Sequence, residues 1–309
     1  MSKTTLVSRE VDPRFRPNGR TWPQIWDWLL ATGGAGKTTY STAMAVIMAL
    51  RGYVITFIDL DQQCNGSAIL GHHPDIRPAG QPDVLDMVLG KRTFEEVRVP
   101  ARYRVTIGEK REDDVYMDIP NLFLVPGTRD LSNGDTLLFE NPHRFNWFKD
   151  FLRDEYEGDD DMFFIDNPAN YGKLVGTVAM MLDEDDEVVP PCLASTKSWD
   201  GFAPLFKELE KVRLQYANSK AIPGRPTVKR IPMLGVQQGK KAEKDAKKAL
   251  ANMQRDYPEL LAGTPFVRYS APAKGLIEEK LPLPLLAPSN PATADFRKVA
   301  TAWGFPDLV

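Results

Sequence analysis

The segment between positions 33 and 39 combines glycines with a lysine and two hydroxyl side chains. It reads Gly33-Gly34-Ala35-Gly36-Lys37-Thr38-Thr39 and lies between a predicted strand and a predicted helix. Glycines let backbone N–H groups approach an anion closely, and a helix N-terminus adds partial positive charge. In such a loop the lysine contacts the β- and γ-phosphates of a nucleotide, and the following hydroxyl binds Mg²⁺. The segment therefore predicts a nucleotide site in which Lys37 and Thr38 have these two roles.

Three aspartates follow predicted strands at the same edge of the sheet. Asp59 and Asp61 come at the end of an apolar run, and Asp166 directly follows the apolar residues 163–165. Carboxyl ends of strands in an open α/β sheet face the ligand, and residues two apart on a strand share a side. An aspartate that ends a buried strand can hold Mg²⁺ through water. We therefore expect Asp59, Asp61 and Asp166 near the phosphates, with Asp166 at the metal.

Strand and helix patterns alternate along the chain. The predicted strands cover 25–31, 53–58, 121–126, 162–165, 188–189, 231–236 and 266–269. The predicted helices cover 40–51, 84–89, 145–156, 201–216, 240–255 and 292–303, with a further short element at 94–97. Several strands are continuous apolar runs, as expected for strands covered on both faces. The pattern predicts an α/β fold with a single doubly wound, mostly parallel sheet and helices on both faces, the P-loop NTPase fold.

The 309 residues show no internal repeat and no clear linker. We expect residues 24–309 to form a single domain, preceded by a flexible basic arm at 1–23. Residues 98–117 are charged and irregular, which favours an exposed hairpin or loop. The acidic runs 159–161 and 183–187 are predicted to be solvated loops.

Composition limits the partners that the chain can bind. The formal net charge of -3 means that any surface for nucleic acid must be a local patch.

The two cysteines are too few for a disulfide framework and have no metal-ligand spacing, which indicates a reducing cytoplasm. No apolar run has transmembrane length, and Gly304 and Pro306 are incompatible with a C-terminal amphipathic membrane helix. We expect a cytoplasmic protein that does not bind membranes.

The predicted helix 240–255 carries a basic stripe. At 100° per residue, about a third of its circumference gathers the cations Lys240, Lys241, Lys244, Lys247, Lys248 and Arg255. Small and apolar residues fall on the opposite side. Such a stripe can neutralise DNA phosphates without reading bases, so binding would be non-specific and sensitive to salt. The alternative interpretation is a solvated Lys/Ala-rich helix.

These motifs together resemble the ParA/MinD/Soj family of P-loop ATPases. The loop is similar to the family's deviant Walker A pattern K-G-G-x-G-K-T-T, and residues 58–63 are similar to its D-x-D-P-Q motif. The segments 121–127, 163–168 and 188–201 also follow the family's order. The family's signature lysine, which reaches the partner subunit's nucleotide, falls on Thr32. Either another cation replaces it, or hydrolysis and dimer coupling are weaker.

The resemblance is greatest to ParA-type partition proteins. It implies ATP and Mg²⁺ as cofactors, with Asp59 in the outer shell of the metal and Asp61 orienting the attacking water, beside Lys37. It further implies an ATP-dependent homodimer, non-specific DNA binding, a ParB-like partner that stimulates hydrolysis, and association with the nucleoid.

Other interpretations remain open on the sequence alone. The same fold could serve a positioning or conjugation ATPase that acts through protein cargo, which the missing lysine favours. A small-molecule ligase or synthetase is a third possibility, although no residue set demands its substrate pocket. Gln237, at the end of a late strand, is a candidate for adenine recognition, and an ordinary polar turn explains it equally well.

Overall fold

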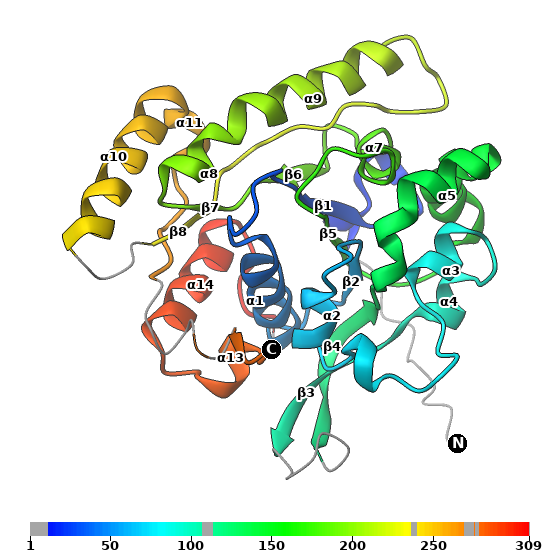
Figure 1. Ribbon diagram of the computed structural model, residues 1–309, viewed down its shortest axis with the longest axis horizontal. Helices are drawn as coiled ribbons and strands as arrows, with labels where there is room; N and C mark the ends of the chain where they lie inside the picture. Colours follow the sequence, from blue (N-terminus) through cyan, green and yellow to red (C-terminus); the bar gives the residue numbers. More distant parts are fainter. Residues whose placement is uncertain (1–11, 107–113, 236–239, 269–274, 276–277, 309) are drawn as a thin grey trace.

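The computed structural model describes residues 12–106, 114–235, 240–268, 275 and 278–308, with backbone only at 240–243 (Figure 1). Within these ranges a central sheet has the strand order β3-β4-β2-β5-β1-β6. Its strands are β1 Gln24–Trp28, β2 Ile55–Asp59, β3 Val99–Thr106, β4 Val115–Val125, β5 Met162–Asp166 and β6 Glu187–Val189. All neighbours pair in parallel except β3, which is antiparallel to β4. The predicted mostly parallel sheet is confirmed.

The predicted strand 231–236 is reduced to Met233–Leu234 in the structure. β7 Cys192–Leu193 and β8 Met233–Leu234 pair in parallel in a separate two-stranded sheet. From the expected strand 266–269, Val267 forms an isolated bridge to Leu234, and residue 269 lies outside the described part of the chain. Pro191 directly precedes β7 and Pro232 directly precedes β8, and because proline has no N–H to donate, neither strand extends in that direction.

Helices cover both faces of the sheet. One face is covered by α1 Lys37–Leu50, α13 Leu283–Leu286 and α14 Pro291–Ala302. The other is covered by α3 Val84–Val88, α4 Phe94–Val97, α6 Trp147–Asp150, α7 Lys173–Ala179 and α9 Phe202–Tyr216. The shorter or more peripheral helices are α2 Asn65–Ile69, α5 Gly134–Glu140, α8 Thr196–Asp200, α10 Lys240–Asp256 and α11 Pro258–Leu261. Figure 1 shows α14 beside α1 and α10 at the periphery.

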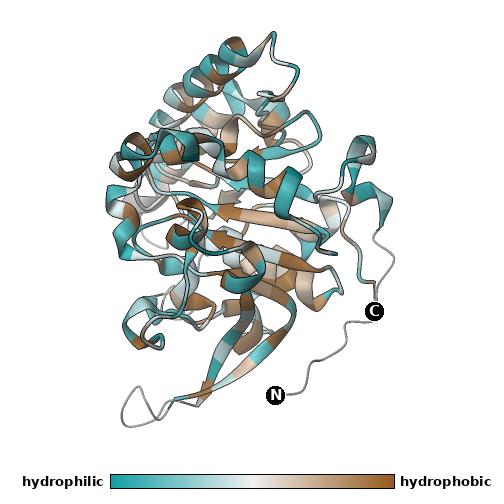
Figure 2. Cartoon of the chain, turned by 90° about the vertical axis from the view of Figure 1, so that its right-hand side faces the viewer, coloured by the Kyte–Doolittle hydropathy of each residue, from teal (hydrophilic) through white to brown (hydrophobic). Residues whose placement is uncertain are grey.

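The alternation of side chains along the strands separates the two cores. On β5, Phe163 and Ile165 belong to the cluster beneath α6 and α7, whereas Met162 and Phe164 belong to the cluster beneath α1 and α14. All four side chains are fully buried, as expected for a parallel strand between two helical layers. Figure 2 shows apolar strands inside and helices with polar outer surfaces.

Strands β3 and β4 form the hairpin expected near residues 98–117. The strand β3 lies at the edge of the sheet, and its register with β4 shifts between Pro100 and Arg102 and again between Arg104 and Thr106. Beyond the body of the domain, one face of the hairpin leaves apolar side chains in solvent. Val105, Val115 and Met117 are 39%, 51% and 54% exposed, respectively.

Residues 12–23 pack against the domain, in contrast to the flexible arm expected there. Phe15 is buried, with its ring 5.7 Å from Tyr53 and 6.1 Å from Phe305. Arg20 donates to Asp186 at 2.6 Å and to Asp183 at 2.8 Å. Residues 1–11 lie outside the described residues, so the rest of the arm stays a prediction.

The acidic runs are not the solvated loops that were expected. Asp160 and Glu187 are buried, and each pairs with an arginine at 2.8 Å. Their partners, Arg98 and Arg230, come from distant parts of the chain. Burial of a carboxylate is costly unless a cation compensates it, so these pairs explain how the acids can lie in the core.

We predict that Arg20→Met lowers the free energy of unfolding by roughly 3–5 kcal/mol, because it leaves Asp186 buried without its cation. Burial already raises the pKa of Asp186 to about 6. Protonation removes the uncompensated charge, so the loss should be larger at pH 8 than at pH 5. Urea unfolding at both pH values measures it. The double variant Arg20→Met/Asp186→Asn should regain most of the loss, and equal losses at the two pH values would contradict the explanation.

Candidate functional site

The glycine-rich segment forms one wall of a cleft at the carboxyl edge of the sheet. The cleft has a volume of about 400 Å³. It is lined by Gly33, Gly34, Ala35, Gly36, Lys37, Thr38, Thr39, Asp61, Gln62, Gln63, Asn65, Pro168, Ala169 and Asn170. The backbone is left-handed at Gly34, with φ 76°, and at Gly36, with φ 90°. A Cβ on Gly36 would also collide with the side chain of Leu234, so glycine is required there on two grounds.

Lys37 begins α1 directly below the cleft. Its side chain is mostly buried, and Nζ donates to the carbonyl oxygen of Leu30 at 2.9 Å. Burial lowers the pKa of the ammonium, and the nearby carboxyls Asp166 and Asp61 oppose that shift. The loop thus holds a cation in place before any anion arrives.

Thr38 and Asp166 meet beneath the cleft. Thr38 Oγ1 donates to Asp166 Oδ2 at 2.7 Å. The other carboxylate oxygen, Asp166 Oδ1, is buried and has no hydrogen-bond partner among the described residues. Burial, together with the charge of Asp59, raises the pKa of Asp166 well above its ordinary value. A hydroxyl beside an unpartnered carboxylate oxygen fits Mg²⁺, which takes oxygen ligands and would also favour the ionised acid.

Asp59 lies next to Asp166, but its hydrogen bonds go to Ser67 and to the backbone of Asp61. The two aspartates are register partners on β2 and β5. Asp59 Oδ2 accepts from Ser67 N at 2.7 Å and from Ser67 Oγ at 2.6 Å, and Oδ1 accepts from Asp61 N at 3.2 Å. Burial raises the pKa of Asp59 to about 7, and the hydrogen bonds from Ser67 oppose that shift. Asp59 therefore fixes the first turn of α2 through Ser67, whereas Asp61 lines the cleft.

Sequence reasoning did not find Ser67. Its hydroxyl also accepts from Gly127 N at 2.8 Å, so one buried side chain connects α2, the end of β2 and the loop after β4. The signal was present as a small polar residue shortly after the two aspartates, in Asn65-Gly66-Ser67.

The predicted base contact, Gln237, lies outside the described residues. Gly235, the last residue described before that gap, lines an apolar cavity of about 240 Å³. It is lined by Met233, Leu234, Phe266 and Val267 among others, and Leu234 is the side chain that packs on Gly36.

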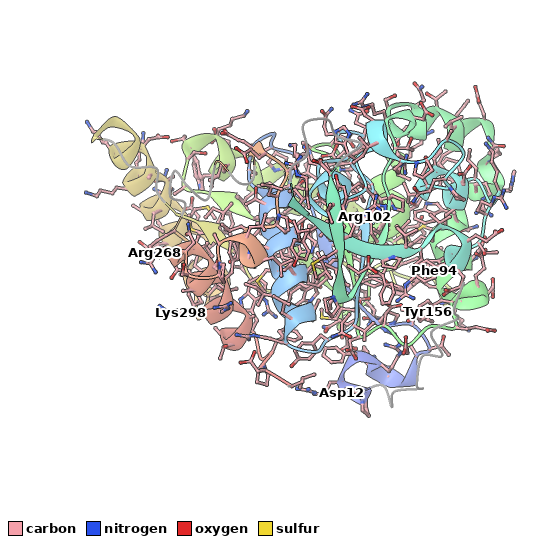
Figure 3. The ribbon with its side chains drawn as sticks, turned by 90° about the horizontal axis from the view of Figure 1, so that it is seen from below. Asp12, Phe94, Arg102, Tyr156, Arg268 and Lys298 are labelled. Carbon is pink, nitrogen blue, oxygen red and sulfur yellow. The ribbon has the colours of Figure 1, made fainter. Side chains whose placement is uncertain are left out.

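The basic helix α10 packs as its sequence pattern suggested. Ala246, Ala249 and Met253 are buried, and Lys244, Lys247 and Lys248 are exposed. Arg255 forms an ion pair with its neighbour Asp256 at 2.6 Å, which reduces the charge that it can offer. The side chains of Lys240 and Lys241 lie outside the described part. Figure 3 shows Arg268 and Lys298 near this end of the molecule.

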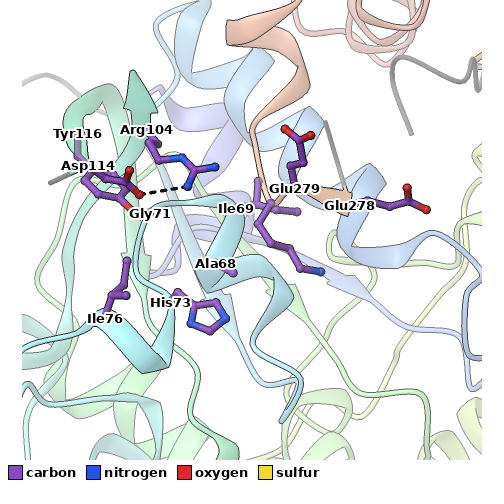
Figure 4. Close-up of a pocket in the computed structure, with 11 residues that line it drawn as sticks. Ala68, Ile69, Gly71, His73, Ile76, Arg104, Asp114, Tyr116, Glu278 and Glu279 are labelled. Carbon is purple, nitrogen blue, oxygen red and sulfur yellow. Dashed lines mark hydrogen bonds and ion pairs between the residues drawn. The ribbon is translucent and has the colours of Figure 1, made fainter. Parts of the chain in front are cut away.

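A second cavity, of about 340 Å³, lies on the other side of α2 (Figure 4). Arg104 and Asp114 form an ion pair across the hairpin at 3.1 Å and contribute one wall. Lys280 contributes another wall, and its Nζ donates to Asn65 Oδ1 at 2.7 Å. Because Asn65 also lines the first cleft, the helix α2 separates the two cavities.

Within the described ranges, no helix is both long and apolar enough to cross a membrane. Among the residues that the structure describes, no group of three or more histidine, cysteine, aspartate and glutamate side chains is arranged to hold a metal ion.

Known proteins are similar to this chain in sequence or in fold. A family model described as an AAA domain matches residues 30–222. The cell division protein PomZ of Myxococcus xanthus is 27% identical over 232 residues, which cover 75% of this chain and 63% of PomZ. A putative replication protein A of Rhizobium rhizogenes is 30% identical over 239 residues, which cover 68% of this chain and 54% of that protein. The chain thus spans less than two thirds of the length of these relatives.

A solved structure has the same fold. The ATP complex of a McdA variant from Cyanothece superposes with a TM-score of 0.68 at 20% identity, covering 93% of this chain and 98% of that chain. The family model covers more than half of the chain, and its range includes the glycine loop, both aspartate motifs and the strands between them. The chain therefore belongs to this AAA-domain family, as a P-loop ATPase of the ParA/MinD type.

Proposed function

We propose that this protein is a DNA-partition ATPase, which binds ATP and Mg²⁺, dimerises with ATP, holds DNA non-specifically and segregates a plasmid or chromosome. One observation supports the nucleotide part of the proposal. Thr38 and Asp166 are hydrogen-bonded beneath a glycine-lined cleft, and Asp166 Oδ1 is buried with no hydrogen-bond partner among the described residues. Family membership supports the rest.

Each residue of the loop has a role in this proposal. The amides of Gly33, Gly34, Ala35, Gly36 and Thr39 hold phosphate oxygens, together with Lys37 and Thr38. Lys37 lies below them with its ammonium already fixed by Leu30. Thr38 and Asp166 hold Mg²⁺, and Asp59 acts from the outer shell by fixing the strand end beside Asp166. When bound, the metal neutralises charge that develops on the phosphates.

Asp61 is the proposed catalytic carboxylate, with Lys37 as its cationic counterpart. It lies on the cleft wall, and burial raises its pKa above the ordinary value for aspartate. A carboxylate with a raised pKa accepts a proton more readily, so Asp61 can orient a water and take up its proton. The backbone N–H of Gln63 donates to Asp61 Oδ1 at 2.9 Å and keeps the side chain in place.

Thr32 stands where the family pattern has its signature lysine, and its side chain is not cationic. A cation that reaches the partner's nucleotide would therefore come from elsewhere in the proposed dimer. Gln237 remains the proposed contact to the adenine edge. A ParB-like protein is the proposed activator, and the nucleoid is the proposed location.

A second candidate is a positioning or conjugation ATPase that acts through protein cargo. The exposed apolar side chains of Val105, Val115 and Met117 on the hairpin favour it, because such surfaces are typical of protein contacts. Full DNA affinity together with no captured protein would argue against this candidate.

We predict that Lys37→Met weakens binding of a fluorescent ATP analogue by at least about 100-fold, because it removes the ammonium at the phosphates. Equilibrium fluorescence titration with Mg²⁺ measures the affinity. Lys91→Met is the matched control, since it makes the same change at an exposed position outside the cleft. Equal affinities of Lys37→Met and the wild type would refute the proposed nucleotide site.

Dimerisation can be tested in a form that does not turn over. We predict that Asp61→Ala with ATP and Mg²⁺ elutes at twice the mass of the nucleotide-free protein in light scattering, because blocked hydrolysis retains the triphosphate. Adding Lys37→Met to the same chain should restore the monomer mass. A monomer under all these conditions would contradict the ATP-dependent dimer.

DNA binding is predicted to depend on α10. Lys244→Glu/Lys248→Glu should weaken DNA binding and make the logarithmic salt slope shallower by about 2, since each lost phosphate contact removes about 0.9. Lys207→Glu/Lys211→Glu on α9 makes the same charge change and should leave the slope unchanged. Fluorescence anisotropy over a salt series, with ATP present, measures both. If the two variants behave alike, the stripe is a solvated surface.

A further inference from the structure

A buried aspartate and a buried asparagine face each other beneath the nucleotide cleft. Asp27 is the next-to-last residue of β1, and Asn167 directly follows the last residue of β5. Both side chains are fully buried. Asn167 Nδ2 donates a hydrogen bond to Asp27 Oδ1. The remaining oxygens of this pair, Asp27 Oδ2 and Asn167 Oδ1, are buried and have no partner among the described residues.

Two acceptor oxygens without donors are unfavourable in a dry core. A single proton on Asp27 Oδ2 satisfies both, because the resulting O–H can donate to Asn167 Oδ1. The acid and the amide would then form a ring closed by two hydrogen bonds, with every polar atom of the pair used. A charged Asp27 would leave Asn167 Oδ1 without a donor.

We propose that Asp27 is a protonated positioning residue, whose carboxylic acid forms a two-hydrogen-bond ring with the Asn167 amide and thereby fixes Asp166. The strand β1 leads into the glycine loop, and β5 leads to Asp166 and to the cleft wall at 168–170. The backbone N–H of Asn167 also donates to the carbonyl oxygen of Trp28 at 3.3 Å. The ring would tie both walls of the cleft together without adding charge near the phosphates.

The surroundings of Asp27 favour the neutral acid. Its register neighbours on β5 and β6 are Ile165 and Val188, and the core on its side of the sheet is apolar. Burial raises the pKa of Asp27 to about 7, the hydrogen bond from Asn167 opposes the shift, and the carboxylate of Asp186 adds to it. Asp186 is itself paired with Arg20, so its influence is partly compensated.

The ring can be tested without nucleotide. In ¹³C NMR spectra, the carboxyl resonance that disappears in Asp27→Asn should have a protonated shift at pH 5 and titrate near pH 7. An acid whose pKa is raised on folding favours the folded state only while it is protonated. The unfolding temperature of the wild type should therefore fall relative to Asp27→Asn between pH 5 and pH 8, because two amides can keep the ring at every pH. A resonance that titrates near pH 4 would overturn the proposal.

The positioning role rests on the proposed nucleotide site and needs a second measurement. Asp27→Asn should bind the ATP analogue within about threefold of the wild type, whereas Asp27→Val should bind it about tenfold more weakly, since small displacements in such sites are costly. Thr56→Val is the control, because Thr56 is buried in β2 and bonded to Asp160, outside the cleft. It should lose stability and keep its affinity. Equal affinities of Asp27→Val and the wild type would refute the positioning role.

The two proposals can fail separately. If the wild type binds no ATP, the proposed function fails while the NMR and unfolding data still decide the ring. If Asp27→Val does not fold, the variant Asn167→Asp is used instead, and the pH dependence of its unfolding temperature is measured. Its two facing carboxyls cannot both be ionised in the core and must share one proton, so this variant should lose stability with rising pH more steeply than the wild type. A profile parallel to that of the wild type would also overturn the ring.

Discussion

The hydrogen bond from Thr38 to Asp166 joins the first turn of α1 to the end of a central strand, and the rest of the site is arranged around it. Parallel pairing of β2 with β5 places Asp59 opposite Asp166, so two acids end side by side with Asp61 close by. Lys37 is the cation that opposes them, and it is mostly buried. Three neighbouring carboxyls beside one ammonium are electrostatically unfavourable on their own. A metal ion bound together with the nucleotide would compensate the excess negative charge.

The parts of the fold predicted from the sequence are those that local patterns specify. A glycine loop between a strand and a helix is recognisable because its spacing and context are fixed by the anion it holds. The apolar run of β5 indicates a strand buried on both faces, and Phe163 and Phe164 do lie in opposite cores. The short strands near 192 and 233 were less predictable, because their pairing depends on partners far along the chain.

The polar interior could not be predicted in the same way. Runs of acidic residues usually face water, yet Asp160 and Asp186 are fully buried. Each is compensated by an arginine from another part of the chain, Arg98 in one case and Arg20 in the other. Local periodicity carries no information on such pairs, because a single sequence does not show which cation will fold against which acid. The Asp27–Asn167 pair could not be predicted either, because its two residues lie 140 positions apart in the sequence.

The irregular pairing of β3 affects whether other protein chains can add a strand to this edge of the sheet. An open strand at the rim of a sheet is a template on which other chains can add strands, which is how many proteins aggregate. Here the rim strand contains Pro100, which has no N–H to offer, and two breaks in register that distort its outer edge. The charged side chains of Arg102 and Arg104 add a further obstacle. These features oppose the addition of a further strand at this edge, even though the same hairpin exposes apolar side chains.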